Sequence, residues 1–201
     1  MRSVFVVCLC VLTATASLAD GDQPIEALRK GVEEAIRILK NPEFTNADRK
    51  DVQQQKLRAI MARLFDFDEF SRRVLASKWK DFTPAQRKEF VDAFSDFLAK
   101  FYLGQLQRRY KDETLIYVEQ QLTSPTRALV KVRVVWRGEK IPVDLLMIKR
   151  EGLWKVYDIQ LLGFSAIRNY RAQFQFMLLK ETPDQVIERL KMKTEQLEKG
   201  D

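Results

Sequence analysis

The sequence predicts an α+β fold in which helices pack on the concave face of a curved, four-stranded antiparallel sheet. Apolar residues follow helical spacing before residue 110 and again after Gly163, and they follow a period of two in the segment between. Consecutive strands flanked by runs of helices are typical of α+β domains, because α/β domains alternate the two kinds of element.

The first two helices are predicted from apolar periodicity. One runs from about Ile25 to Leu39 and ends at Asn41-Pro42, since proline disfavours helical backbone in the residue before it. The next begins near Thr45 or Asn46. Its apolar face appears late in the helix, at Leu57, Ile60, Met61 and Leu64.

Two N-terminal capping boxes predict the next helices. Asp66 is followed by Glu69 at the capping-box position, and Thr83 is followed by Gln86 with Pro84 between them. The second box begins a long helix that ends near Tyr110. That helix carries a stripe of phenylalanines at spacings of four, three and four: Phe90, Phe94, Phe97 and Phe101.

The strands follow from Thr114 onward. They are expected at 114–121, 127–136, 140–149 and 153–162. Gly138 and Gly152 mark turns that join the last three strands as hairpins. Gly163 ends the pattern, and two helices follow, one over about 165–180 and one that begins at a third capping box at Thr182.

The middle strands are apolar on both faces. Val130, Val132 and Val134 alternate with Leu129 and Val135, and the next strand shows the same surplus. A sheet with one solvated face would alternate more cleanly. The surplus fits either helices on both faces or an internal cavity.

Composition excludes several classes of protein. The chain has 201 residues, of which 46% are hydrophobic and 31% charged, so it is long and apolar enough for one well-packed domain. It has no histidine, and its two cysteines are Cys8 and Cys10. We therefore expect no metal site, no cofactor, no histidine-dependent catalytic triad and no disulfide framework.

The first residues resemble a secretory signal peptide. Arg2 precedes a short apolar run over 4–12, and small residues end at Ser17-Leu18-Ala19. We expect cleavage after Ala19, so that residues 1–19 are the signal peptide and 20–201 form a single domain. A cysteine-free exported protein suits the bacterial periplasm. In an exported protein, the net charge of +7 indicates anionic membranes or acidic partners rather than nucleic acid.

Several motifs, in order, resemble the MlaC (toluene-tolerance) family. They are Phe65-Asp66-Phe67, Trp79, the stretch Thr83–Phe90, the stretch Trp154–Ile159, Gly163-Phe164-Ser165 and the stretch Asn169–Phe174. The similarity spans roughly residues 44–190. It implies a cone-shaped fold like nuclear transport factor 2 and a periplasmic carrier of phospholipid. The implied partners are an inner-membrane MCE-domain and ABC transporter complex and an outer-membrane lipoprotein complex. Some relatives are associated with hopanoids instead.

An enclosed apolar pocket for acyl chains is therefore expected between the sheet and the helices. Its predicted lining is Phe67, Phe70, Val74, Phe94, Phe97, Phe101, Val132, Val134, Val143, Leu145, Tyr157, Ile159, Ile167, Tyr170 and Phe174. Arg73, Arg168 and Arg171 are candidates for contact with a lipid phosphate at the pocket mouth, since guanidinium groups bind phosphate well. For each arginine alone, a solvated helix face is the simpler interpretation.

Asp144 and Asp158 form the one candidate catalytic pair. If Lys149 pairs with Leu153 across the Gly152 turn, these two carboxylates lie directly opposite each other, with Arg133 nearby. Paired carboxylates can perform acid–base chemistry, as in an isomerase or dehydratase. A structural cross-strand ladder is the favoured interpretation, and we expect no enzyme. A small-molecule enzyme and an interaction adaptor with a solid core remain as alternatives.

Overall fold

The computed structural model describes residues 23–44 and 46–199, so the predicted signal peptide with Cys8 and Cys10 lies outside the described residues. The helices are α1 (Pro24–Leu39), α2 (Lys50–Leu64), α3 (Phe67–Leu75), α4 (Pro84–Arg109), α5 (Ala166–Met177) and α6 (Pro183–Lys199). The strands are β1 (Thr114–Ser124), β2 (Arg127–Trp136), β3 (Glu139–Arg150), β4 (Leu153–Leu161) and β5 (Phe164–Ser165). Short 3₁₀ helices occupy Pro42–Phe44, Ala47–Arg49 and Ala76–Asp81.

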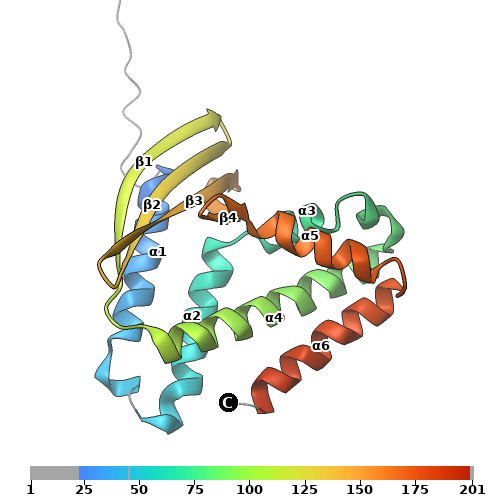
Figure 1. Ribbon diagram of the computed structural model, residues 1–201, viewed down its shortest axis with the longest axis horizontal. Helices are drawn as coiled ribbons and strands as arrows, with labels where there is room; N and C mark the ends of the chain where they lie inside the picture. Colours follow the sequence, from blue (N-terminus) through green and yellow to red (C-terminus); the bar gives the residue numbers. More distant parts are fainter. Residues whose placement is uncertain (1–22, 45, 200–201) are drawn as a thin grey trace, which may run out of the picture.

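The α+β prediction is confirmed, with one additional strand. The sheet is antiparallel in the order β1-β2-β3-β4-β5, and it curves so that α1 lies against its concave face (Figure 1). The two-residue strand β5 was not expected, because Gly163 reads as a simple break in the pattern. Leu162 and Gly163 instead form a tight turn that brings Phe164 back opposite Leu161.

The predicted capping boxes at Thr83 and Thr182 both form, at the starts of α4 and α6, and the one at Asp66 forms only in part. Thr83 and Gln86 form the complete capping box of α4. The Asp66 carboxylate accepts a hydrogen bond from the Glu69 amide, at 2.9 Å, but Glu69 does not return one. The Asp66 amide donates instead to the carbonyl of Val156 in β4, which ties the start of α3 to the sheet.

The predicted pairing of Asp144 with Asp158 is wrong. Asp144 lies opposite Gln160, and Asp158 lies opposite Leu146. The β3–β4 turn contains Glu151 and Gly152 alone, and a bulge after the Met147–Val156 pair leaves Tyr157 as the extra residue and places Asp158 opposite Leu146. These two features shift the register by two positions.

Arg133 is not the strand neighbour of Asp144 either. It pairs with Pro142, and Lys131 is the residue opposite Asp144. The two carboxylates therefore share neither a cross-strand position nor an arginine bridge, so the structure does not form the predicted dyad.

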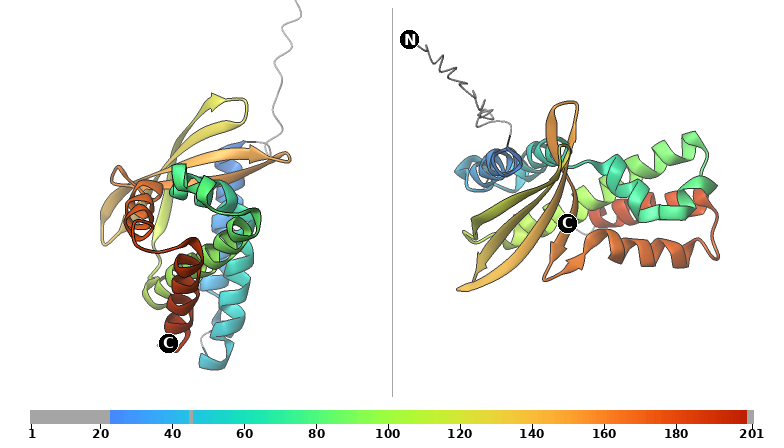
Figure 2. Two further views of the ribbon diagram at one scale, coloured as in Figure 1. Left: turned by 90° about the vertical axis from the view of Figure 1, so that its right-hand side faces the viewer. Right: turned by 90° about the horizontal axis from the view of Figure 1, so that it is seen from above.

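Helices cover both faces of the sheet at one of its ends. On one face, Leu28 of α1 packs with Val130, Val132, Leu145 and Val156. On the other, Ile148 and Tyr157 pack with residues of α3, α4, α5 and α6. The sheet and α1 thus form one end of the molecule, and α3, α5 and α6 gather at the other (Figure 2). This two-sided packing accounts for Leu146 and Ile148 of β3, whereas Leu129 and Val135 of β2 are half-buried outside these two cores.

Gly31 allows α1 and α2 to approach closely. A Cβ atom at this position would lie 2.5 Å from the terminal methyl groups of Leu64 in α2. Because real Cβ contacts are never this short, any larger residue at position 31 would have to displace the Leu64 side chain.

Glu69 is the most enclosed charged group of α3. Its side chain is 1% exposed, and it forms ion pairs with Arg72, Arg73 and Arg150 at 2.7–3.2 Å. Burial alone raises the pKa of this carboxyl, but hydrogen bonds from Arg72 and Arg73 outweigh burial, so its net pKa lies below its ordinary value. The ion pairs hold α3 against the end of β3.

We expect Glu69→Gln to destabilise the protein by about 1–3 kcal/mol at neutral pH, because it removes charge-assisted hydrogen bonds to a buried group. Since the folded-state pKa is lowered, the stabilisation is present above the unfolded value of about 4.5 and is lost as the pH falls below it. Urea unfolding from pH 7 to pH 3 should therefore show the wild type and variant converging in acid. Glu89→Gln, which alters an exposed pair with Lys191, is the matched control and should change stability by less than about 0.5 kcal/mol. A constant difference across that pH range would contradict this role of Glu69.

Candidate functional site

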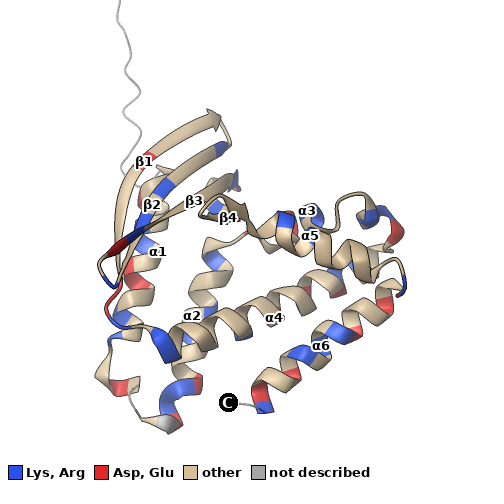
Figure 3. Cartoon of the chain, viewed as in Figure 1, with Lys and Arg blue, Asp and Glu red and all other residues tan. Residues whose placement is uncertain are grey.

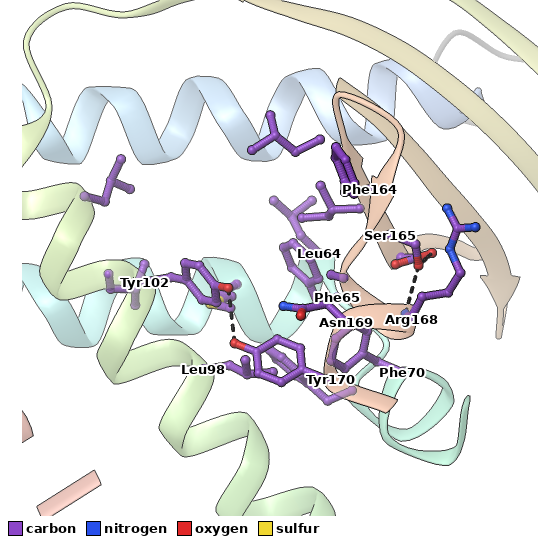
Figure 4. Close-up of a pocket in the computed structure, with 18 of the residues that line it drawn as sticks. Leu64, Phe65, Phe70, Leu98, Tyr102, Phe164, Ser165, Arg168, Asn169 and Tyr170 are labelled. Atoms are coloured by element: carbon purple, nitrogen blue, oxygen red, sulfur yellow. Dashed lines mark hydrogen bonds between the residues drawn. The ribbon is translucent and has the colours of Figure 1, made fainter. Parts of the chain in front are cut away.

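A large apolar cavity opens between the helices and the end of β4. Its volume is about 1170 Å³, above the roughly 300–1,000 Å³ typical of small-molecule sites. Figure 4 shows its walls converging from α2, α4 and the segment that runs from β4 through β5 into α5. The complete lining is Ala35, Leu57, Ile60, Met61, Leu64, Phe65, Phe67, Phe70, Leu98, Tyr102, Leu103, Leu106, Asp158, Ile159, Leu161, Leu162, Gly163, Phe164, Ser165, Ala166, Arg168, Asn169 and Tyr170.

The wall is apolar at depth. Leu57 and Ile60 of α2 are buried, as are Leu98 and Leu103 of α4. These helices face the cavity because their apolar residues recur on one side, at positions three or four apart. Apart from Asp158 and Ser165, the buried residues of the lining are apolar, so the deep part of the cavity offers mainly hydrocarbon contacts.

The cavity is open at one end. The exposed residues that line it form what we call the mouth: Tyr102, Leu106, Leu161, Leu162, Gly163, Phe164, Arg168 and Asn169. Arg168 is the one basic residue in the lining, and its guanidinium donates to the Gly163 carbonyl at 3.0 Å. A ligand with apolar chains and a polar or anionic end matches this distribution.

Two tyrosines connect the helices beside the mouth. The hydroxyl groups of Tyr102 in α4 and Tyr170 in α5 form a hydrogen bond of 3.1 Å (Figure 4). Burial raises the pKa of the Tyr170 hydroxyl, and the bond to Tyr102 raises it further. The Tyr170 hydroxyl therefore stays neutral at physiological pH, and the bond joins two walls of the cavity.

Asp158 is buried in the cavity wall and fully hydrogen-bonded. Its carboxylate accepts from the Ser165 hydroxyl at 2.7 Å and from the Ile167 amide at 3.1 Å. Ser165 in turn caps α5 by accepting from the Arg168 amide. A carboxylate at a helix N-terminus is stabilised by the unpaired amides and by the helix dipole. Asp158 thus fixes the first turn of α5 against β4, which positions Arg168 at the mouth.

Four of the predicted apolar residues lie on the cavity wall: Phe67, Phe70, Ile159 and Tyr170. Another group is buried in the core that joins α3, α4, α5 and α6, namely Val74, Phe94, Tyr157, Ile167 and Phe174. Val132, Val143 and Leu145 pack in the core between the sheet and α1. Phe97 stacks on Phe101 beside the first core, at 6.0 Å between ring centroids, and Val134 is half-buried in β2.

Of the three candidate arginines, the structure places Arg168 alone on the cavity wall. Arg171 donates two hydrogen bonds to the Arg73 carbonyl, at 2.7 and 3.1 Å. Arg73 pairs with Glu69 and stacks over the Tyr157 ring, 4.5 Å from its centroid. Arg171 therefore braces α5 against α3, and the Arg73 side chain braces α3 against β4.

Sequence reasoning missed the wall formed by α2. The apolar face of that helix, with Leu57, Ile60 and Leu64, is visible in the sequence, but periodicity does not reveal whether a face meets side chains or a void. The turn residues Leu161 and Leu162 were missed because they follow the strand pattern. The signal that could have identified them is the presence of apolar side chains beside a glycine, because turns ordinarily carry polar side chains there.

Within residues 23–44 and 46–199, no group of three or more His, Cys, Asp or Glu side chains is placed to hold a metal ion. No helix in the same described ranges is both long and apolar enough to cross a bilayer.

Comparisons with known proteins agree with this architecture. The family model of the MlaC protein matches residues 29–192. The crystal structure of a phospholipid-binding protein from Ralstonia solanacearum, in complex with a phospholipid, aligns with a TM-score of 0.75. It is 23% identical, and the alignment covers 89% of this chain and 99% of that one. This likeness establishes the shared fold.

We expect Asp158→Asn to destabilise the protein by about 1–3 kcal/mol. The two oxygens of the carboxylate each accept one hydrogen bond, whereas an asparagine side chain has a single acceptor oxygen and no charge. Asp144→Asn, at the half-buried position opposite Lys131, is the matched control and should change stability by less than about 0.5 kcal/mol. Urea unfolding of both variants measures the difference. An Asp158→Asn variant as stable as the wild type would refute the structural role and leave the carboxylate free for chemistry.

Proposed function

Because the chain belongs to the MlaC family, we propose that it is a lipid carrier that encloses phospholipid acyl chains in the cavity and leaves the headgroup at the mouth. The observation that carries this proposal is the cavity itself, with its volume of about 1170 Å³ and its apolar walls. The protein from Ralstonia solanacearum, which shares the fold, was crystallised with a phospholipid.

The energetics of lipid transfer explain why such a cavity is needed. Each buried methylene contributes about 0.8 kcal/mol, so that one sixteen-carbon chain exposed to water costs roughly 12 kcal/mol. An open groove would leave much of each chain wet. An apolar cavity that surrounds most of each chain is similar to the bilayer interior, so exchange between the two is close to balance, and a carrier can both load and unload.

The polar end of the cargo is expected at Arg168. Its guanidinium is exposed at the mouth, and one of its terminal nitrogens is used by the Gly163 carbonyl. Arginine can bind a phosphate oxygen through its other N–H groups. A hopanoid-type lipid remains the alternative cargo, since its apolar body would occupy the same walls.

The carrier is proposed to work in the periplasm, between an inner-membrane MCE-domain and ABC transporter complex and an outer-membrane lipoprotein complex. Its predicted signal peptide and its family support this location and these partners. Transfer close to balance means that the partner complexes set the direction, because the chain itself supplies no energy source.

A catalytic function on the same fold is less well supported. Its candidate dyad does not form, because Asp158 lies opposite Leu146 and is committed to Ser165 and Ile167. We therefore propose that the protein is not an enzyme.

The position of the pocket can be tested with one matched pair of variants. Ile159→Glu places a carboxylate on the cavity wall, where acyl chains would desolvate it, and should lower co-purifying lipid by about tenfold or more. Val134→Glu changes a half-buried strand residue outside the cavity and should leave lipid loading unchanged. Native mass spectrometry after mild purification measures both.

Lipid extraction with headgroup analysis identifies the cargo. Phospholipid in the wild-type protein and little in Ile159→Glu is the expected result. Wild-type protein that is free of lipid would overturn the carrier proposal, and an Ile159→Glu variant that is folded and fully loaded would place the binding site elsewhere.

A further inference from the structure

The turn between β4 and β5 exposes an unusual set of apolar side chains. Leu161 is 50% exposed, Leu162 is 61% exposed and Phe164 is 79% exposed. All three also line the cavity mouth. Large apolar residues scattered on a surface are ordinary, but a cluster at the opening of a cavity is typical of an interaction site.

The backbone conformation of this turn does not explain why leucine occupies position 162. Leu162 and Gly163 have φ values of 51° and 81°, and positive φ at both central positions favours Asn or Asp followed by Gly. Two of the other hairpin turns of the sheet, β2–β3 and β3–β4, have the same geometry but carry charged residues at the first position, Arg137 and Glu151. Leucine is sterically disfavoured there, so neither burial nor backbone preference accounts for Leu162.

The turn is held rigidly at the mouth. The Leu162 amide donates to the Pro142 carbonyl at 3.2 Å, and Arg168 donates to the Gly163 carbonyl. Phe164 pairs with Leu161 across the turn, and the next residue, Ser165, is bonded to Asp158. The exposed apolar side chains are therefore carried at the mouth by a fixed backbone.

The charge beside the turn is positive. Arg168 adjoins the turn at the start of α5, and the charged residues of α5 are Arg168 and Arg171, both basic (Figure 3). In the cavity lining the acidic residue is Asp158, which is buried beneath α5. Exposed leucine and phenylalanine next to arginine is the composition of elements that lie in the headgroup region of anionic membranes.

We propose that the β4–β5 turn is a membrane-contact element, which inserts Leu161, Leu162 and Phe164 into the surface of an anionic phospholipid bilayer and aligns the cavity mouth with it. The inference rests on the proposed carrier function, because contact between the turn and a bilayer is useful only if lipid passes through the cavity mouth. A bilayer is favoured over a protein partner because one tight turn is far smaller than the roughly 800 Å² that each side of a stable protein interface buries.

The test is co-sedimentation of the purified protein with protein-free vesicles of phosphatidylethanolamine and phosphatidylglycerol. The variant is Leu162→Asn combined with Phe164→Ser. Asparagine accepts positive φ more readily than leucine, so the turn should remain folded. We expect the partition coefficient of this variant to fall about tenfold or more, because two side chains no longer enter the bilayer.

The matched control is Glu151→Asn. This variant places asparagine at the equivalent position of the β3–β4 turn, where φ is 50°. That turn does not line the cavity. It should bind vesicles like the wild type, and circular dichroism should show that both variants are folded.

Two outcomes would overturn the proposal. One is wild-type protein that carries lipid but does not bind the vesicles, or binds them equally well after Leu162→Asn and Phe164→Ser. The other is binding only to native membranes, abolished by prior protease treatment, which would identify a protein partner. Wild-type protein that binds vesicles but never carries lipid would instead contradict the carrier function and leave membrane contact standing.

Discussion

An apolar cavity remains open only if the side chains that form its walls are held back by packing behind them, because water drives apolar surfaces together. In this protein, wall residues also belong to the solid cores. Phe70 and Leu98 are part of the core that joins α3 to α6, and Leu57 and Leu103 form part of a smaller core between α2 and α4. The cavity is the space that these cores leave between them, so its shape is fixed by packing elsewhere.

Strand β4 connects these parts. Val156 faces the core around α1, Tyr157 joins the core around α5, Asp158 anchors the first turn of α5, and Ile159 lies on the cavity wall. The bulge at Tyr157 makes this possible, because it changes which side chains point to each face. One irregular strand thus contributes to two cores, anchors a helix and supplies part of the cavity wall.

The sequence was sufficient for the fold class, the order of the elements and the capping box at Thr83, because each depends on periodicity or on local backbone chemistry. It was insufficient where two elements meet. Nothing in the residues marks the bulge at Tyr157, so the register that separates Asp144 from Asp158 was not predictable. Apolar strand residues such as Val143 look the same whether they face a helix or a void, so the cavity was expected against the sheet rather than against α2.

The close contact of α1 with α2 has a consequence for how this protein can diversify. Leu64 touches Gly31 on one side and the cavity on the other. Substituting alanine or serine for Gly31 would force the Leu64 side chain to shift away from α1. Position 31 does not line the cavity, yet through Leu64 it can change the space inside it.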